Sequence, residues 1–404
     1  MKSPKSSLTN VTTKLKNLPR FNVMASLSVV IAVATIGYVL FSTSAAGFFA
    51  SLEPEDGTPG GNASIVTDSG ASGGKALQFG TAATGGGGST AGWPASPPAQ
   101  VCGNNSVLGG GPATAPAGAV TVPAGNNSNM DLEQANKTYW FAPGVHTLGT
   151  DQYSQIAPAS GSTYVGAPGA IIDGQGKNNY AFTQKGKNVT IKYLTIRNFT
   201  APRDEGVVNH DAGDGWTIEY NTIADNKGAG LMAGPNNTYR YNCIKDNGQY
   251  AINACCGEDS EAGDIKNFVL DHNEIAGNNT DDWESKVEGC GCTGGVKFWL
   301  NKDVTVTNNW VHHNHGVGLW LDNNNRGFRL ENNYINDNEG FAIMAEAGYD
   351  FQIRYNNIVR NGIVEGSAFA ARKDPFPTGA IYISESGSPP VSYTHLTLPT
   401  IRLV

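Results

Sequence analysis

Charged residues are scarce in this chain of 404 residues, at 15% of the sequence, and the basic ones are the scarcer kind. The 27 Lys and Arg residues are outnumbered by 35 Asp and Glu residues. This balance argues against a nucleic-acid partner, because no basic stripe is available to neutralise phosphates. Glycine, with 51 copies, and Asn are abundant instead. They favour short strands joined by tight turns that need left-handed backbone geometry.

Cysteine is also scarce, with six residues in the whole chain. An even number in an extracellular protein suggests disulfides, although the sequence leaves the pairing open. Zinc is the weaker alternative, because the gap of about two to four residues inside a zinc-binding Cys pair is absent. The six residues are Cys102, Cys243, Cys255, Cys256, Cys290 and Cys292.

Residues 24–41 form an uncharged, mostly apolar run that follows a basic stretch. Such a run is long enough to cross a bilayer as a helix with its basic flank in the cytoplasm. Small residues at 44–46 allow a cleaved signal peptide instead. We favour an anchor, because the apolar core of a signal peptide usually has roughly 7–15 residues. Residues 1–47 therefore predict a membrane-anchored protein with the rest of the chain outside the cell, or alternatively a secreted one.

Composition divides the remaining chain into four segments. Residues 48–80 contain runs such as EPEDGT and KALQFG, which resemble the opening of bacterial β-sandwich carbohydrate-binding modules, and predict a short β-rich spacer. Residues 81–138 are rich in Gly, Ser, Pro and Asn and predict a linker and lead-in. Residues 139–390 carry strand patterns. Residues 391–404 resemble a translated sequencing adapter, so we expect a non-native tail after a truncated natural chain; a capping strand is the alternative.

An Asn followed five residues later by another Asn, with an aliphatic or Cys residue in between, recurs six times in the segment 139–390. A variable period with a shortest value near twenty residues is typical of a solenoid with inserted loops. We expect an all-β fold, a right-handed single-stranded parallel β-helix, in which the Asn side chains stack and bond to the backbone of neighbouring turns. The first members, which form the expected ladder, are Asn221, Asn242, Asn273, Asn309, Asn333 and Asn356.

The strand after each pair supplies a predicted exposed face, because side chains alternate inward and outward along a strand. Aligning VKFW, LWLD, IMAE and IYIS gives one outward row of Lys297, Trp320, Met344 and Tyr382. A second outward row contains Trp299, Asp322, Glu346 and Ser384. The aromatic residues Trp299, Trp320 and Tyr382 are candidates for stacking on sugar rings. An ordinary solvated sheet face is the alternative.

Asp322 and Glu346 are predicted to be stacked carboxylates, because neighbouring coils lie about 4.8 Å apart. Two such acids either raise each other's proton affinity or share a cation, so calcium is the expected ion if one is bound. Together with Lys297 they are the candidate catalytic residues. No cofactor is otherwise indicated.

Three insertions, 255–266, 279–294 and 362–378, are expected to wall the edges of this face. A disulfide between the first two loops, pairing Cys255 or Cys256 with Cys290 or Cys292, would stiffen the wall. Two His-containing corners complete the set of candidates. NHDAGDGW at 209–216 reads as a turn in preference to an acid–base pair, and VHHNHG at 311–316 is a weak indication of a metal site.

The coils, the APGVHTL opening and the strand PTGAIYISESG resemble secreted right-handed β-helix proteins of the pectate-lyase-like superfamily. Members cleave acidic polysaccharides, epimerise uronic acids or bind glycans without catalysis. The resemblance implies a polysaccharide lyase or glycosidase-type protein, with a cell-surface adhesion protein as the alternative, and a monomer. In a lyase Lys297 would be the base. The Gly-His-Gly and Arg-Ile-Lys motifs of polygalacturonase-type hydrolases are absent, so their mechanism is not carried over.

Overall fold

The computed structural model describes residues 63–67, 75–79, 94, 96–183, 185–255, 265–286, 293–363 and 379–384. The expected anchor at 24–41, the expected tail at 391–404 and most residues of the three insertions lie outside these ranges. The chain divides into two compact units, residues 1–88 and 89–404. Each unit is described by itself.

The first unit contains one antiparallel pair of strands, β1 (Ala63–Thr67) and β2 (Lys75–Phe79). They lie within the segment that the sequence predicted to be a β-rich spacer. Among the helices of the described residues, none is long and apolar enough to span a membrane.

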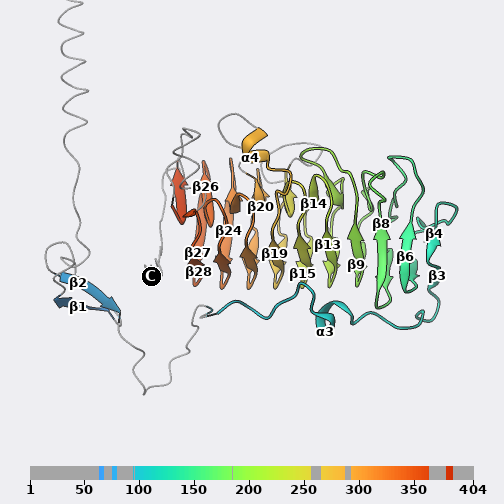
Figure 1. Cartoon of the computed structure of the whole chain (residues 1–404), viewed down its shortest axis with the longest axis horizontal. Coiled ribbons are helices and arrows are strands. Elements are labelled where there is room, and N and C mark those ends of the chain that lie inside the picture. Colours follow the sequence, from blue (N-terminus) through green and yellow to red (C-terminus); the bar gives the residue numbers. More distant parts are fainter. Residues whose placement is uncertain are drawn as a thin grey trace, which may run out of the picture. The chain divides into compact units, whose positions relative to one another are not determined.

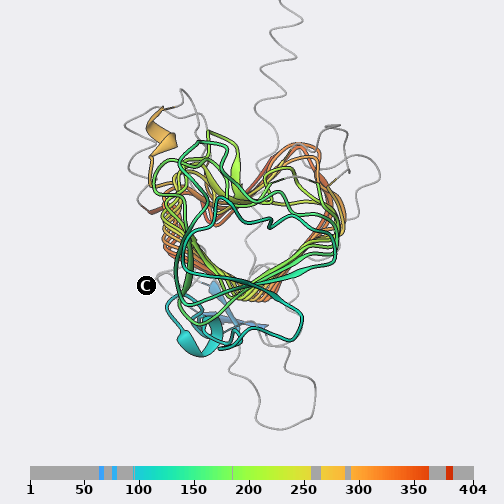
Figure 2. The same cartoon turned by 90° about the vertical axis from the view of Figure 1, so that its right-hand side faces the viewer.

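The second unit consists of three parallel sheets, and each strand pairs with its equivalents in the coils before and after it. Figure 1 shows the strands of successive coils side by side, and Figure 2 shows the coils superimposed when viewed along their stack. From β9 onward each coil uses one strand in each sheet, whereas the earlier coils have strands in two of the three sheets, and this stacking is the topology of a parallel β-helix.

We name the seven-stranded sheet the site sheet. Its strands are β11 (Gly206–Val208), β14 (Ala229–Met232), β17 (Ile252–Ala254), β20 (Gly294–Phe298), β23 (Val317–Leu321), β26 (Ile343–Glu346) and β29 (Ile381–Ser384).

We name one ten-stranded sheet the strap sheet, after the segment that covers it. Its strands are β4 (Gly125–Asn126), β6 (Gly144–Thr147), β8 (Ala170–Asp173), β10 (Thr195–Arg197), β13 (Thr222–Ala224), β16 (Cys243–Lys245), β19 (Glu274–Ala276), β22 (Trp310–His312), β25 (Tyr334–Asn336) and β28 (Asn357–Val359).

The other ten-stranded sheet is the third sheet. It contains β3 (Val120–Val122), β5 (Thr138–Phe141), β7 (Thr163–Gly166), β9 (Thr190–Lys192), β12 (Thr217–Glu219), β15 (Thr238–Arg240), β18 (Val269–Asp271), β21 (Thr305–Thr307), β24 (Arg326–Glu331) and β27 (Tyr349–Arg354). The short helices α3 (Asn105–Leu108) and α4 (Trp283–Lys286) lie outside the sheets.

The parallel sheets begin earlier than the sequence indicated. β3 pairs with β5, and β4 pairs with β6, so the first coil starts at Val120 and not at residue 139. The expected lead-in at 81–138 therefore contains a coil of its own. The strand pattern of this coil is hard to recognise in the sequence, because its two strands have only three and two residues and lie among Pro and Gly residues.

The Asn residues form two continuous ladders inside the coils. In one ladder, Asn242 Oδ1 accepts hydrogen bonds from the backbone N–H and the Nδ2 of Asn221, at 3.0 and 3.1 Å. Asn242 Nδ2 donates to the backbone oxygen of Ile218. The pattern repeats down to Asn356, and the second members repeat it from Asn226 to Asn361. The amides thereby satisfy buried backbone groups at each corner.

The residue before each ladder Asn has a left-handed backbone, which explains the sharp corner. Tyr220 and Tyr241 have φ values of 59° and 53°. Asp225 and Asp246, before the second ladder, have φ values of 57° and 52°. Asn follows the corner because its short amide reaches the backbone of the preceding coil.

The first described residues of the second unit form a strap, residues 96–112, along the outer face of the strap sheet (Figure 1). Just before the strap, Asn357 Nδ2 donates to the backbone oxygen of Pro94 at 2.9 Å. At its other end, Trp140 Nε1 donates to the backbone oxygen of Pro112 at 2.8 Å. The strap therefore runs against the direction in which the coils stack, from β28 to β5.

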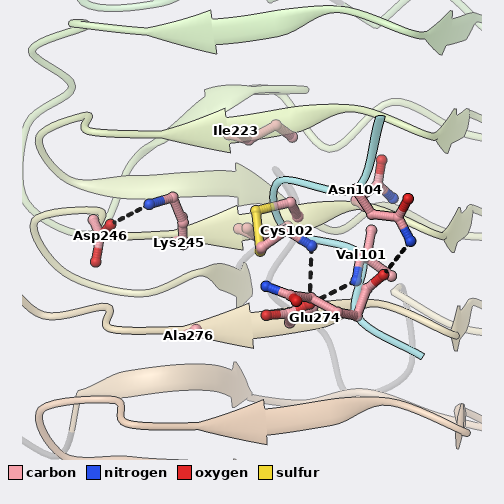
Figure 3. The surroundings of a disulfide bond; sticks show 12 residues. Val101, Cys102, Asn104, Ile223, Lys245, Asp246, Glu274 and Ala276 are labelled. Atoms are coloured by element: carbon pink, nitrogen blue, oxygen red, sulfur yellow. Dashed lines mark hydrogen bonds and ion pairs between the residues drawn. A yellow bond between two sulfur atoms is a disulfide. The ribbon is translucent and has the colours of Figure 1, made fainter. Parts of the chain in front are cut away.

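A disulfide and a buried carboxylate fasten the strap in its middle (Figure 3). Cys102 is bonded to Cys243 of β16. Glu274 of β19 accepts hydrogen bonds at Oε2 from the backbone N–H groups of Val101 and Cys102, at 2.7 and 2.9 Å. The sequence left this disulfide open, because no periodic feature marks its two members.

Candidate functional site

The outward row of the site sheet has the register that the repeats indicated. Lys297 of β20 pairs with Trp320 of β23, Trp320 with Met344 of β26, and Met344 with Tyr382 of β29. One residue of this row is not exposed: Met344 is fully buried. It packs in an outer apolar cluster with Val317, Phe341, Trp320 and Tyr382. The outer surface of the site sheet therefore has a small apolar cluster of its own, and this cluster packs against the rings of Trp320 and Tyr382.

Lys297 is the centre of the candidate site. Its Nζ lies 3.3 Å from Asp322 Oδ2 and 4.0 Å from the centroid of the Trp320 ring. The side chains of Lys297 and Asp322 are 19% and 23% exposed, so the ion pair is largely sheltered but still accessible to solvent. A carboxylate and an aromatic face are both suitable neighbours for an ammonium group. The arrangement suits recognition of an anion by Lys297.

The two carboxylates of the face have different partners. Trp320 Nε1 donates to Glu346 Oε2 at 2.9 Å, whereas Asp322 contacts Lys297. Asp322 and Glu346 follow the paired residues Leu321 and Ala345, so they occupy neighbouring positions on adjacent coils. Each carboxylate has one oxygen in contact with a side chain of the face, an ammonium group in one case and an indole N–H in the other.

Calcium remains a prediction at this face. In the part of the chain that the structure describes, no group of three or more His, Cys, Asp or Glu side chains could hold a metal ion. Asp322 and Glu346 supply two carboxylates, and both already have partners. We therefore derive no chemical step through calcium.

The described part of the second insertion forms a wall beside the site sheet. Trp283 of α4 lies under Arg203, whose Cζ is 5.2 Å from the ring centroid, and Lys286 lies 5.0 Å from the same ring. Lys227 forms an ion pair with Asp281. Asp281 thereby tethers the insertion to the coil that contains β14. Figure 2 shows α4 projecting from the stacked coils.

The expected disulfide between the insertions is only partly described. Cys255 is disulfide-bonded, and its partner lies outside the described residues, as do Cys256, Cys290 and Cys292. Trp299, predicted to be a stacking residue, is half-buried at the end of β20.

A cluster near β11 contains residues that the sequence analysis missed. The rings of Tyr180 and His210 stack with centroids 4.0 Å apart, and the Tyr180 hydroxyl donates to Glu205. Thr183 Oγ1 donates to Asp211 Oδ2 at 2.6 Å. Burial, followed by the contact with Glu205, raises the pKa of Tyr180 well above its ordinary value. The motif NHDAGDGW is thus more than a turn, but its partners lie on other coils and carry no spacing signal.

Comparisons with known proteins address the architecture. A family model described as a right-handed beta helix region matches residues 256–392. No curated protein matches the chain. The described coils form a right-handed parallel β-helix, as the sequence predicted.

Several solved structures are similar to this chain. The A-module of the mannuronan C-5 epimerase AlgE6 from Azotobacter vinelandii has 16% identity and a TM-score of 0.46, covering 60% of this chain and 66% of that one. The AlgE4 A-module from the same organism has 15% identity and a TM-score of 0.44, covering 61% and 71%. Pectate lyase Pel9A has 11% identity and a TM-score of 0.38, covering 62% and 70%. The chain thus spans just under two thirds of the AlgE6 A-module.

Proposed function

We propose that this protein binds and cleaves an acidic polysaccharide on the outer face of the site sheet. The observation that carries the proposal is Lys297, which is held as a cation between the Asp322 carboxylate and the Trp320 ring. A partly exposed ammonium beside aromatic rings matches a uronic-acid chain, which offers carboxylates and apolar ring faces together.

The positions of the three groups suggest separate roles. Lys297 contacts a substrate carboxylate, because its ammonium group is partly exposed beside the Trp320 ring. Asp322 and Glu346 are then the groups available for proton transfer, one protonating the glycosidic oxygen while the other takes a proton from water or from the sugar ring. Trp320 positions Glu346 through its indole N–H. Trp299 and Tyr382 extend the aromatic surface.

The Cys102–Cys243 disulfide supports an extracellular location, since such bonds persist in oxidising compartments. We propose display at the cell surface through the N-terminal apolar run, with secretion as the alternative. A monomer remains our prediction.

The experiment that tests the catalytic proposal separates cleavage from binding. Asp322→Asn and Glu346→Gln are compared with wild type on polygalacturonate, alginate and a neutral glucan. Reducing ends and the absorbance of unsaturated ends report cleavage, and affinity electrophoresis reports binding. Asp303→Asn is the matched control, because Asp303 is half-exposed and pairs with Lys302 away from the site sheet. We expect cleavage to fall at least 100-fold while binding changes by less than about tenfold.

A second candidate function is glycan binding without catalysis. It is favoured by the partners that Asp322 and Glu346 already have in the structure. Wild-type protein that binds acidic polymers but releases neither kind of end from any of them would establish this alternative and reject the enzyme. Failure to bind any acidic polymer would reject both.

A further inference from the structure

A pair of imidazoles lies beside the carboxylate that fastens the strap, at the end of β22. His312 Nδ1 and His313 Nδ1 are 2.8 Å apart. His312 lies in the outward row of the strap sheet, with a side chain that is 12% exposed, whereas His313 occupies the next corner and is exposed. The two ring nitrogens therefore point at each other from a sheltered position and an open one.

The tautomer of His312 follows from its contact with Glu274. Glu274 is 3% exposed and accepts two backbone N–H groups at Oε2. A carboxylate accepts hydrogen bonds, so His312 Nε2–H donates to Glu274 Oε1, at 3.3 Å.

The tautomer of His312 is thereby fixed with its lone pair on Nδ1. A carboxylate that orients one ring nitrogen so that the other is free to ligate is the usual outer partner of a metal-binding histidine. Two nitrogens about 2.1 Å from one metal ion would be about 3.0 Å apart at the right angle of a square-planar or tetragonal site, and about 3.4 Å apart at a tetrahedral angle. The observed 2.8 Å separation is closer to the right-angle value. Without an ion this contact is a hydrogen bond in which His313 Nδ1–H donates to His312 Nδ1, so metal binding moves the His313 proton to its Nε2.

We propose that His312 and His313 bind a divalent transition-metal ion of the Zn²⁺, Ni²⁺ or Cu²⁺ class through their Nδ1 atoms, with Glu274 as the outer carboxylate. Imidazole ligands select this class over calcium or magnesium. Water completes the coordination, because the nearby Asp337 carboxylate is held by Arg360, with Nε 2.6 Å from Oδ1. The site belongs to the strap sheet and is independent of the polysaccharide proposal.

Glu274 contacts both the strap and His312, so metal binding is expected to affect the stability of the strap. Glu274 joins the strap amides at one oxygen and His312 at the other. A metal ion on Nδ1 increases the acidity of the Nε2–H group and strengthens its bond to Glu274. Metal binding is therefore expected to stabilise the fastened strap.

The test is a titration of tag-free protein with intact disulfides by ZnCl₂ in a calorimeter. We expect one saturable event per chain in the wild type, and its loss in His313→Asn. Asn tolerates the left-handed backbone of this corner, where φ is 53°. Glu274→Gln should weaken the event by about 10- to 100-fold. His315→Gln is the matched control, because His315 contacts Glu339 instead, and should leave the event unchanged.

A second readout uses the indole of Trp310, which lies 4.1 Å from the His312 ring. CuCl₂ should quench part of the tryptophan fluorescence in the wild type and in His315→Gln. The quenching should disappear in His313→Asn and in Trp310→Phe, whereas Trp310→Phe should keep the calorimetric event. The absence of a saturable event in the wild type, or its persistence in His313→Asn, would overturn the proposal.

Discussion

The outer faces of the strap sheet and the site sheet are built on the same coils but have opposite uses. On the strap sheet the strap, which belongs to no repeat, lies over the outward row. Two of its backbone N–H groups donate to Glu274, and the Cys102–Cys243 disulfide links it to the sheet. On the site sheet the outward row is occupied by Lys297, Trp320 and their partners, which remain within reach of solvent. Both faces are parallel sheets of the same coils. The outward side chains therefore determine whether a face is covered by the strap or reached by solvent.

The covered face also shows what the open face lacks. Glu274 binds main-chain N–H groups that are 172 and 173 residues away in sequence, and it thereby fixes one part of the chain to another. Lys297 and Asp322, by contrast, contact only side chains of adjacent coils. Contacts of the first kind stabilise the fold, and contacts of the second kind orient groups toward a ligand. This contrast gives four predictions, taken from the largest effect to the smallest.

The largest effect is expected from removing the disulfide of the covered face. Cys102→Ala with Cys243→Ala opens a link between residues that are 141 positions apart. Such a long closed loop predicts a loss of about 4 kcal/mol in the free energy of unfolding. Urea denaturation followed by circular dichroism measures it. Binding of acidic polysaccharide should stay within about twofold, since the disulfide and the hydrogen bonds that fasten the strap are made to Cys243 and Glu274, outside the candidate site. A larger loss of binding would show that the two faces are coupled.

The next effect is a pH dependence at Glu274. Because its folded pKa lies below the ordinary value of 4.5, its contribution is complete above that value and is lost as the pH falls through the lower folded pKa. Glu274→Gln should cost about 2 kcal/mol at neutral pH, because it weakens charge-assisted hydrogen bonds to the strap. The difference from wild type in denaturation midpoints should shrink below about pH 4.5. A difference that stays constant from pH 7 to pH 3 would contradict this role.

A substitution in the outward row of the site sheet should change polysaccharide binding much more than the free energy of unfolding. Lys297→Gln removes the cation between Asp322 and Trp320, and we expect about 10- to 100-fold weaker binding of acidic polysaccharide, with less than about 1 kcal/mol change in stability. The dependence of binding on salt should also decrease. Lys302→Gln is the control, because Lys302 pairs with Asp303 outside the site sheet. Equal losses in the two variants would indicate a general effect of charge and reject the site.

The two faces were not equally predictable from the sequence. The site sheet follows the repeats, so the alignment of Asn pairs gave the correct partners for Lys297, Trp320 and Met344. Alternation along a strand indicates only the direction of a side chain. It did not reveal that Met344 is buried in a cluster with Phe341, or that Asp322 contacts Lys297.

The strap was not predictable, because it belongs to no repeat. Its residues are Pro- and Gly-rich, and its partners are fixed by tertiary contacts with coils far away in sequence. One signal was present but weak. Glu274 lies in an outward row between Cys243 and Trp310. A carboxylate between two such side chains is costly to bury unless a hydrogen-bond donor pairs with it, which indicates that another part of the chain covers this position.

The smallest effect comes from one substitution made on each face. Trp320→Phe and Trp310→Phe both keep an aromatic ring and remove an indole N–H, which donates to Glu346 in the first case and to Asn336 in the second. Each should lower the free energy of unfolding by about 1 kcal/mol, the usual worth of one hydrogen bond. Only Trp320→Phe should weaken polysaccharide binding, by about three- to tenfold, because Glu346 loses the donor that orients it. Equal binding by the two variants would mean that Glu346 does not need this orientation, and that the open face recognises its ligand through Lys297 and the ring faces alone.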